Sequence, residues 1–181
     1  MLHHSNIHKC RGYVRPGVLI AVDGPGGVGK SVIVREIAEY LKEIGVPVYT
    51  TRQPSTGTLG TYARQHADSF HGMALANLLA ADRQYQQETE IEPRLADGNV
   101  VLCDRYLPSS LVLQGIDGVS TDTVWALNSG IRVPDASVFL RADPTILPPG
   151  YGAGVVLTTD SKRSPATQNG SWRCSTSSPR I

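Results

Sequence analysis

One octapeptide constrains the fold of this chain more than any other feature. Residues 24–31 read Gly-Pro-Gly-Gly-Val-Gly-Lys-Ser and fit the pattern G-x-x-x-x-G-K-[ST] at every fixed position. An apolar run, residues 18–22, precedes them, and apolar residues at helical spacing follow them over residues 34–44. A phosphate-binding loop lies between a strand and a helix in this order. A chance match to the motif would not require a strand before it or a helix after it. The motif therefore predicts a nucleotide site.

Each residue type in this loop has a physical reason. Glycines allow successive backbone N–H groups to turn toward phosphate oxygens, and the N-terminus of the following helix adds partial positive charge. Lys30 is expected to reach the β- and γ-phosphates, and the hydroxyl of Ser31 to bind Mg²⁺. The predicted ATP-binding residues are Gly24, Pro25, Gly26, Gly27, Val28, Gly29, Lys30 and Ser31.

Composition limits the class of protein. A chain of 181 residues is long enough for one α/β domain, and its net charge of +1 gives no reason to expect a nucleic-acid or membrane partner. No apolar stretch approaches the length of a membrane span. The three cysteines lie far apart without C-x-x-C spacing, which favours a reducing, cytoplasmic location.

The order of apolar runs predicts the architecture. Strands are expected at residues 46–51, 100–104 and 136–140, in addition to the first, with a long helix from about Met73. Pro93 is expected to start a separate short helix that ends at residues 97–98. Runs that are apolar on both faces are typical of parallel strands covered by helices. The pattern predicts an α/β fold with a three-layer, doubly wound parallel sheet of the P-loop NTPase type.

The two ends of the chain differ from this pattern. Residues 1–16 have no apolar period and are expected to form a disordered leader before a folded domain over residues 17–144. In residues 145–181, about half of the positions are Ser, Thr, Pro or Gly, which predicts a disordered tail. The expected sheet therefore lacks its last strand and helix, and a frameshift near residue 145 would explain the change of composition.

Charged residues near the ends of the predicted strands are the candidates for chemistry. Asp104 closes an apolar strand at the edge where ligands bind in such sheets, so it could hold Mg²⁺, and Arg105 beside it could neutralise phosphate. Arg52 and Arg83 could clamp an acceptor phosphate with their guanidinium groups. Each of these four residues could also be an ordinary polar surface residue when taken alone.

The order of these residues resembles the thymidylate kinase family across residues 18–144. The family segment T-R-E-P-G-G-T-x-L-G is similar to residues 51–60, its helix motif A-x-R is similar to residues 81–83, and its D-R-Y-x-x-S signature is similar to residues 104–109. The Leu-Asn and Pro-Asp pairs at residues 127–128 and 134–135 also match. The signature together with the T-R-x-P turn is much more specific than the phosphate loop alone.

The resemblance implies transfer of the γ-phosphoryl group of ATP to dTMP, with Mg²⁺. It implies that Arg105 bridges the donor and acceptor phosphates. Arg105 would then act in catalysis together with Lys30 and Asp104, the candidates already given by the glycine motif and the strand end. The resemblance also implies that Arg52 and Arg83 hold the monophosphate, that Ser110 and Gln114 face the base, and that the protein is a possible homodimer. Phosphoryl transfer depends mainly on positioning and charge neutralisation, which suits a site built from cationic side chains.

Four departures from the family pattern leave alternatives open. Gly26 replaces an acid that contacts the sugar, Leu79 replaces an aromatic residue that stacks on the base, and Gln53 replaces a glutamate. The arginine-bearing lid expected after residue 144 has no clear match, with Lys162 and Arg163 as the candidates. A kinase of another small acceptor and a nucleotide-binding remnant with little transfer activity are therefore the alternatives.

Overall fold

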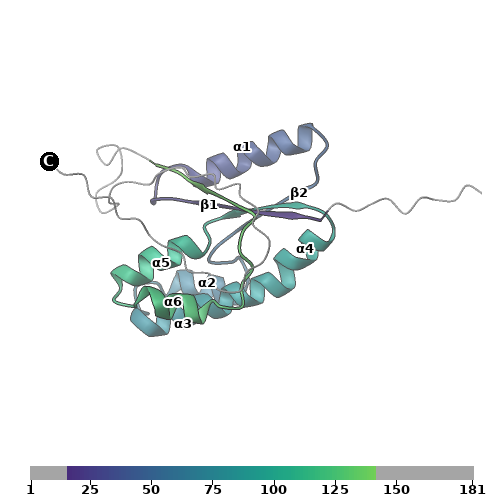
Figure 1. Cartoon of the computed structure of the whole chain (residues 1–181). Helices are drawn as coiled ribbons and strands as arrows, with labels where there is room; N and C mark the ends of the chain where they lie inside the picture. The colour runs from purple at the N-terminus through teal and green to yellow at the C-terminus, as the bar shows by residue number, and fades with distance from the viewer. Residues whose placement is uncertain (1–15, 142–181) are drawn as a thin grey trace, which may run out of the picture.

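The computed structural model describes residues 16–141, and these form a parallel sheet with helices on both faces (Figure 1). The predicted tail and the predicted leader, apart from Pro16, lie outside this range. The elements follow one another as β1 (Val18–Asp23), α1 (Lys30–Glu43), β2 (Val48–Arg52), α2 (Thr58–Gln65), α3 (Gly72–Gln86), η1 (Gln87–Ile91), α4 (Glu92–Ala96), β3 (Val100–Asp104), α5 (Leu107–Ile116), α6 (Thr121–Leu127) and β4 (Ala136–Phe139).

The sheet brings the ends of three strands to one edge. Its order is β2-β3-β1-β4, and every neighbouring pair is parallel. Asp104 is in register with Val22 of β1 and with Arg52 of β2, so the carboxyl ends of these strands lie side by side. The predicted doubly wound α/β fold is confirmed, and the candidate site residues lie at the edge where this fold binds ligands.

Both faces of the sheet are buried. On one face α1 packs through Val34 and Ala38 on Val22 and Leu102. On the other face, α3 to α6 cover the remaining side chains of β1 and β3 (Figure 1). The apolar runs of these strands have no polar alternation because both of their faces contribute to the core. The result is the predicted three-layer arrangement.

The end of α1 explains where β2 begins. Gly45 adopts the left-handed conformation, with φ of 76°. Its N–H donates to Lys42 O at 3.0 Å, and the N–H of Val46 donates to Leu41 O at 2.8 Å. These two hydrogen bonds form a Schellman motif, in which the backbone N–H of Val46 is still bonded to the last turn of α1. The predicted C′ glycine is confirmed, and β2 starts at Val48, two residues later than predicted.

The prediction of a short helix with Pro93 in its first turn is confirmed by α4. The π-helical turn η1 joins α3 to α4 without a break, and Pro93 lies in the first turn of α4. A π-helical turn shifts the register of the backbone hydrogen bonds. This shift comes just before Pro93, which has no N–H to donate. The helical segment ends near Asp97, as predicted.

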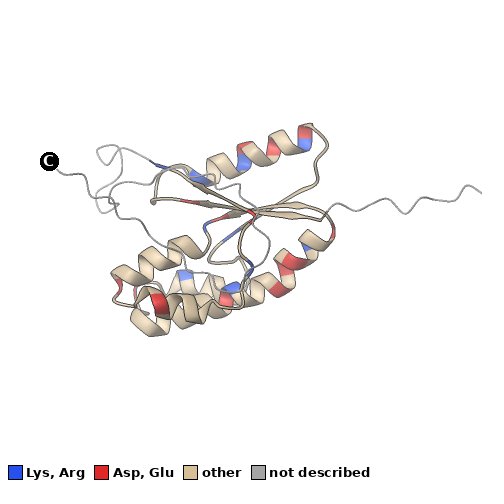
Figure 2. Cartoon of the chain, viewed as in Figure 1, with Lys and Arg blue, Asp and Glu red and all other residues tan. Residues whose placement is uncertain are grey.

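Charges of both signs are interspersed on the helices (Figure 2). On α1, Arg35 lies 3.1 Å from Glu36 and 4.0 Å from Glu39, and all three side chains are exposed. Within residues 16–141, none of the helices has the length and apolar character needed to cross a bilayer.

Candidate active site

The glycine loop has the backbone geometry that its sequence requires. Gly24, Gly27 and Gly29 have positive φ angles of 145°, 75° and 92°. A Cβ atom at Gly24 would lie 2.7 Å from Leu140 O, so a larger residue would collide with the segment after β4. Helix α1 begins at Lys30 with no side-chain cap and no acid in its first turn. Its N-terminal N–H groups are therefore available to an anion.

Lys30 and Ser31 lie where the loop meets the end of β3. The Lys30 side chain is largely buried, and its Nζ donates to Pro25 O at 2.5 Å. Burial, and then the charge of Arg105, lower the pKa of Lys30 from its ordinary value. Ser31 Oγ donates to Asp104 Oδ2 at 2.5 Å. The two residues predicted to bind Mg²⁺ thus bring a hydroxyl and a carboxylate oxygen together, which are donors that Mg²⁺ prefers.

Arg105 connects the glycine loop to α5. It is the one residue other than glycine with positive φ (71°) within residues 16–141, and its backbone N–H donates to Val22 O at 2.8 Å. Its Nη1 donates to Ser109 Oγ at 3.2 Å and to Gly24 O at 3.4 Å. The guanidinium group therefore lies between the phosphate loop and the pocket described next.

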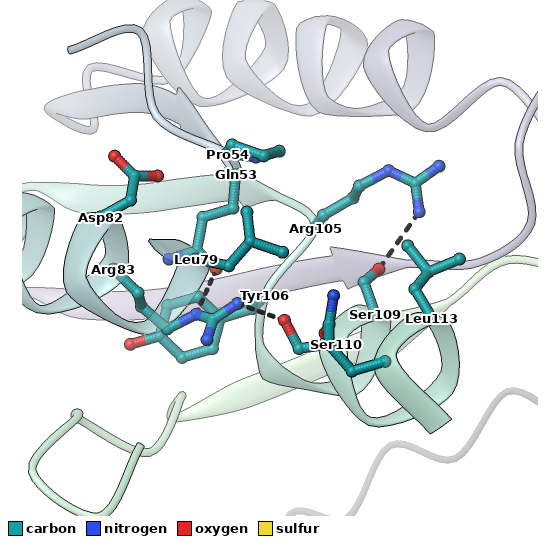
Figure 3. Close-up of a pocket in the computed structure, with 11 residues that line it drawn as sticks. Gln53, Pro54, Leu79, Asp82, Arg83, Arg105, Tyr106, Ser109, Ser110 and Leu113 are labelled. Carbon is teal, nitrogen blue, oxygen red and sulfur yellow. Dashed lines mark hydrogen bonds between the residues drawn. The ribbon is translucent and has the colours of Figure 1, made fainter. Parts of the chain in front are cut away.

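A small pocket opens between the segment after β2, α3 and α5 (Figure 3). Five predicted residues line it: Leu79, Arg83, Arg105, Ser110 and Gln114. The pocket lining that the sequence did not predict consists of Gln53, Pro54, Asp82, Tyr106, Ser109 and Leu113. Arg52, also predicted, is not part of the lining. Its side chain is exposed at the end of β2.

Arg83 is a buried cation held by neutral partners. It is 3% exposed, and burial lowers the pKa of its guanidinium group. Its Nε donates to Gln53 Oε1 at 2.7 Å, its Nη2 donates to Ser110 Oγ at 2.6 Å, and its Nη1 donates to Asn128 Oδ1. Because these acceptors carry no charge, the positive charge in the pocket wall remains available to an anionic or strongly accepting group of a ligand.

The acidic neighbour of Arg83 serves a different purpose. Asp82 accepts hydrogen bonds from the N–H and the Oγ of Ser55, at 2.7 and 2.5 Å. This pair fixes the segment after β2 against α3. The position of Gln53, which bonds to Arg83, therefore depends on a buried carboxylate that does not itself neutralise Arg83.

Gln114 has an unused acceptor in the pocket wall. The residue is 3% exposed, and its buried Oε1 has no hydrogen-bond partner within the described residues. Leu79 forms part of the wall as an apolar group. An unpaired buried acceptor beside an apolar wall suits a planar ligand group that carries an N–H donor.

Three polar residues of this site and one of its neighbours were not predicted as site residues from the sequence. Gln53, Asp82 and Ser109 line the pocket, and Asp23 lies buried at the end of β1. A signal for Asp23 was present, since it closes an apolar strand as Asp104 does. The other three residues stand within the family segments at residues 51–60, 81–83 and 104–109. Their bonds to Arg83, Ser55 and Asp23 join residues far apart in the sequence, and no local pattern indicates these bonds.

Comparisons with known proteins agree with this geometry. The family model for thymidylate kinase matches residues 22–147. Probable thymidylate kinases of Caldivirga maquilingensis and Pyrobaculum aerophilum are 36% and 37% identical over 69% and 70% of this chain, and a thymidylate kinase of Xanthomonas campestris is 35% identical over 87% of it. The chain spans 63%, 66% and 69% of the lengths of these three relatives.

A solved structure supports the same assignment. The crystal structure of thymidylate kinase from Ehrlichia chaffeensis superposes with a TM-score of 0.64 at 28% identity, covering 71% of this chain and 78% of that one. The residues that the family model covers include the glycine loop, the residues that line the pocket and Arg105. The chain belongs to the thymidylate kinase family.

Proposed function

We propose that this protein transfers the γ-phosphoryl group of ATP to dTMP, giving ADP and dTDP. The observation that carries the proposal is the place of Arg105, whose guanidinium group bonds to Gly24 of the phosphate loop and to Ser109 of the pocket. One cation at the junction of two binding sites suits a reaction in which negative charge moves between them.

On the donor side, the loop residues 24–29, apart from Pro25, which has no N–H, bind the ATP phosphates through their backbone N–H groups. Lys30 neutralises the β- and γ-phosphates after exchanging its bond to Pro25 O for phosphate oxygens. Ser31 and Asp104 would hold Mg²⁺, because their oxygens already lie together. When bound, this ion would neutralise charge on the phosphate oxygens of the donor.

On the acceptor side, the pocket takes the nucleoside monophosphate. Arg83 and the exposed Arg52 hold its phosphate, while Ser110 and Gln114 face the base and Leu79 packs on it. The family resemblance supplies these roles. The buried charge of Arg83 and the unpaired Oε1 of Gln114 support them.

The chemical step requires little covalent help from the protein. An oxygen of the acceptor phosphate attacks the γ-phosphorus, and the bond from that phosphorus to the bridging oxygen of ADP breaks. Arg105 and Lys30 stabilise the charge that spreads over the transferring group, and the loop and the pocket keep the reacting oxygens in line.

A kinase for another small acceptor is the second candidate. Leu79 lines the pocket where the family has an aromatic residue, and leucine offers apolar contact without a π-face. Gly26 removes the acid that would contact the sugar. Both changes weaken the selection of thymidine without affecting the phosphate chemistry.

We further propose a cytoplasmic location, supported by the free thiol of Cys103, and a homodimer, which rests on the resemblance alone.

The test is a steady-state assay of ADP formation with ATP, Mg²⁺ and each nucleoside monophosphate in turn. The proposal expects the highest kcat/KM with dTMP and a loss of about 100-fold or more in Lys30→Ala. Strongest turnover with a different acceptor would favour the second candidate. ATP binding without turnover on any acceptor would contradict both and indicate a remnant.

A further inference from the structure

We propose that Asp23 is a positioning residue that holds the guanidinium group of Arg105 at the junction of the two sites, acting through the hydroxyl of Ser109. This inference rests on the proposed function and adds to it a residue from the strand that leads into the phosphate loop.

Asp23 lies buried at the carboxyl end of β1 and bonds to the start of α5. Its Oδ1 accepts hydrogen bonds from Ser109 Oγ at 2.6 Å, from Ser109 N at 3.1 Å and from Tyr106 N at 3.2 Å. Tyr106 is the N-cap residue of α5 and supplies no side-chain cap, and Pro108 has no N–H. A carboxylate from another strand thus takes the place of the missing cap.

The same carboxylate sets the direction of the Ser109 hydroxyl. A hydroxyl group has one proton, and the proton of Ser109 is committed to Asp23 at 2.6 Å. Its lone pairs then point away from the carboxylate, and one of them accepts the hydrogen bond from Arg105 Nη1 at 3.2 Å (Figure 3). Without Asp23 this hydroxyl could rotate, and Arg105 would lose an oriented acceptor.

The neighbours of Asp23 hold Arg105 as well. Val22 O accepts from the backbone N–H of Arg105 at 2.8 Å, and Gly24 O accepts from its Nη1 at 3.4 Å. Residues 22–24 therefore hold both the backbone and the guanidinium group of Arg105. Its φ of 71° is one that most residues other than glycine avoid. Because Gly24 begins the phosphate loop, Arg105 and the ATP phosphates are positioned by one segment of chain.

Asp23 also lies among the cations of the site. Its charge raises the pKa of Lys30 and that of Arg83, although burial lowers both. Its second oxygen, Oδ2, is buried and has no hydrogen-bond partner within residues 16–141. If the carboxylate of Asp23 served only to cap α5, it would not need to lie near both Lys30 and Arg83. Its position near these two cations therefore supports a role in the site.

The test combines Asp23→Asn and Ser109→Ala with Arg105→Ala. Each of the first two variants is expected to lower kcat by about 10- to 100-fold while KM for dTMP changes less than about threefold. If both act through Arg105, neither should lower kcat further in the Arg105→Ala background. Ser109→Thr, which keeps the hydroxyl, should restore most of the activity.

A matched control separates this role from helix capping. Ser120 caps α6, with its Oγ accepting from Thr123 N at 3.2 Å, and its side chain is exposed away from the pocket. Ser120→Ala removes a cap and should leave kcat unchanged. Equal effects of Ser109→Ala and Ser120→Ala, or losses that multiply with Arg105→Ala, would overturn the inference.

A binding measurement keeps this test independent of turnover. An analogue with adenosine and thymidine joined through five phosphates spans both sites, and calorimetry measures its affinity. Asp23→Asn and Ser109→Ala should weaken it about tenfold, with ATP affinity within about twofold of the unmodified protein. Unmodified protein that binds the analogue without forming dTDP would contradict the proposed function alone. Unchanged analogue affinity in both variants, or no binding by the unmodified protein, would overturn this inference.

Discussion

At the scale of single residues, the site depends on cations that have little access to water. Lys30 is 6% exposed and Arg83 is 3% exposed, and among residues 16–141 neither has a direct bond to a carboxylate. Buried positive charge of this kind is costly in the empty protein. Under the proposed function, substrate phosphate would supply the missing negative charge and recover part of this cost on binding.

Lys30 gives the site a dependence on pH. Burial lowers its pKa below the ordinary 10.5, so the free protein holds a neutral amine between the lowered pKa and 10.5. Phosphate binds the charged form, and the affinity for ATP should therefore fall as the pH rises through the lowered pKa. Calorimetric titration with ATP and Mg²⁺ from pH 7 to 10 would measure this decline.

Lys30→Arg is the control for this effect, because a guanidinium group keeps its proton throughout the range. Its ATP affinity, although lower at pH 7, should stay flat over the same interval. A decline of equal size in Lys30→Arg would assign the titration to another group.

Which site residues the sequence predicts depends on how local their pattern is. The loop residues and Asp104 follow from the glycine motif and from the end of an apolar strand. Arg83 was a candidate phosphate clamp by its charge, Ser110 and Gln114 came from family resemblance, and the structure brings all three to one pocket. Arg52 lies apart from the pocket lining, and its phosphate-binding role stays a prediction.

At the scale of elements, the segment after β2 is fixed from two sides. Asp82 of α3 binds the N–H and Oγ of Ser55, and Arg64 of α2 donates to Pro54 O and Ser55 O, both at 2.5 Å. Gly60 of α2 packs directly against Ser55. This segment carries Gln53 into the pocket, so its rigidity determines the shape of the pocket.

Gly60→Ala should destabilise the protein although alanine favours helices. The added Cβ would lie 2.2 Å from Ser55 O and 2.4 Å from Ser55 N, and neither atom can move freely. We expect a loss of about 1–3 kcal/mol in the free energy of unfolding, measured in urea.

Gly115→Ala is the matched control, because a Cβ there meets no atom within 4 Å. This change should stabilise α5 by about 0.5–1 kcal/mol. Stabilisation by both substitutions would contradict the close packing of α2 on the segment that carries Ser55.

The same elements show why some predictions succeeded and others failed. Strands β1, β3 and β4 were predicted to within one residue. The strands β1 and β3 are largely buried and stand out as apolar runs, whereas β4 is only partly buried and was predicted from its apolar sequence. Helix α2 was not predicted, since its sequence is short and contains Gly60 and several polar residues. Its position depends on contacts with α3 and with Ser55, which the local sequence does not reveal.

At the scale of the whole molecule, the sheet predicts an order of local stability. Strands β1 and β3 each pair on both sides, whereas β4 pairs with β1 on one side within residues 16–141. Amide hydrogen exchange should be slowest in β1 and β3. In β4, the amides that do not face β1 should exchange roughly tenfold faster or more. Uniform protection along β4 would contradict this order and indicate that a further segment covers the edge.

The proposed reaction is phosphoryl transfer between the loop and the pocket. The measurement that tests it most directly is a single-turnover reaction of the full chain with ATP labelled in its γ-phosphate, Mg²⁺ and dTMP. We expect label in dTDP, at a rate that Lys30→Ala and Arg105→Ala each lower by about 100-fold or more. Label found in inorganic phosphate alone, or retained in ATP that is bound to the protein, would contradict it.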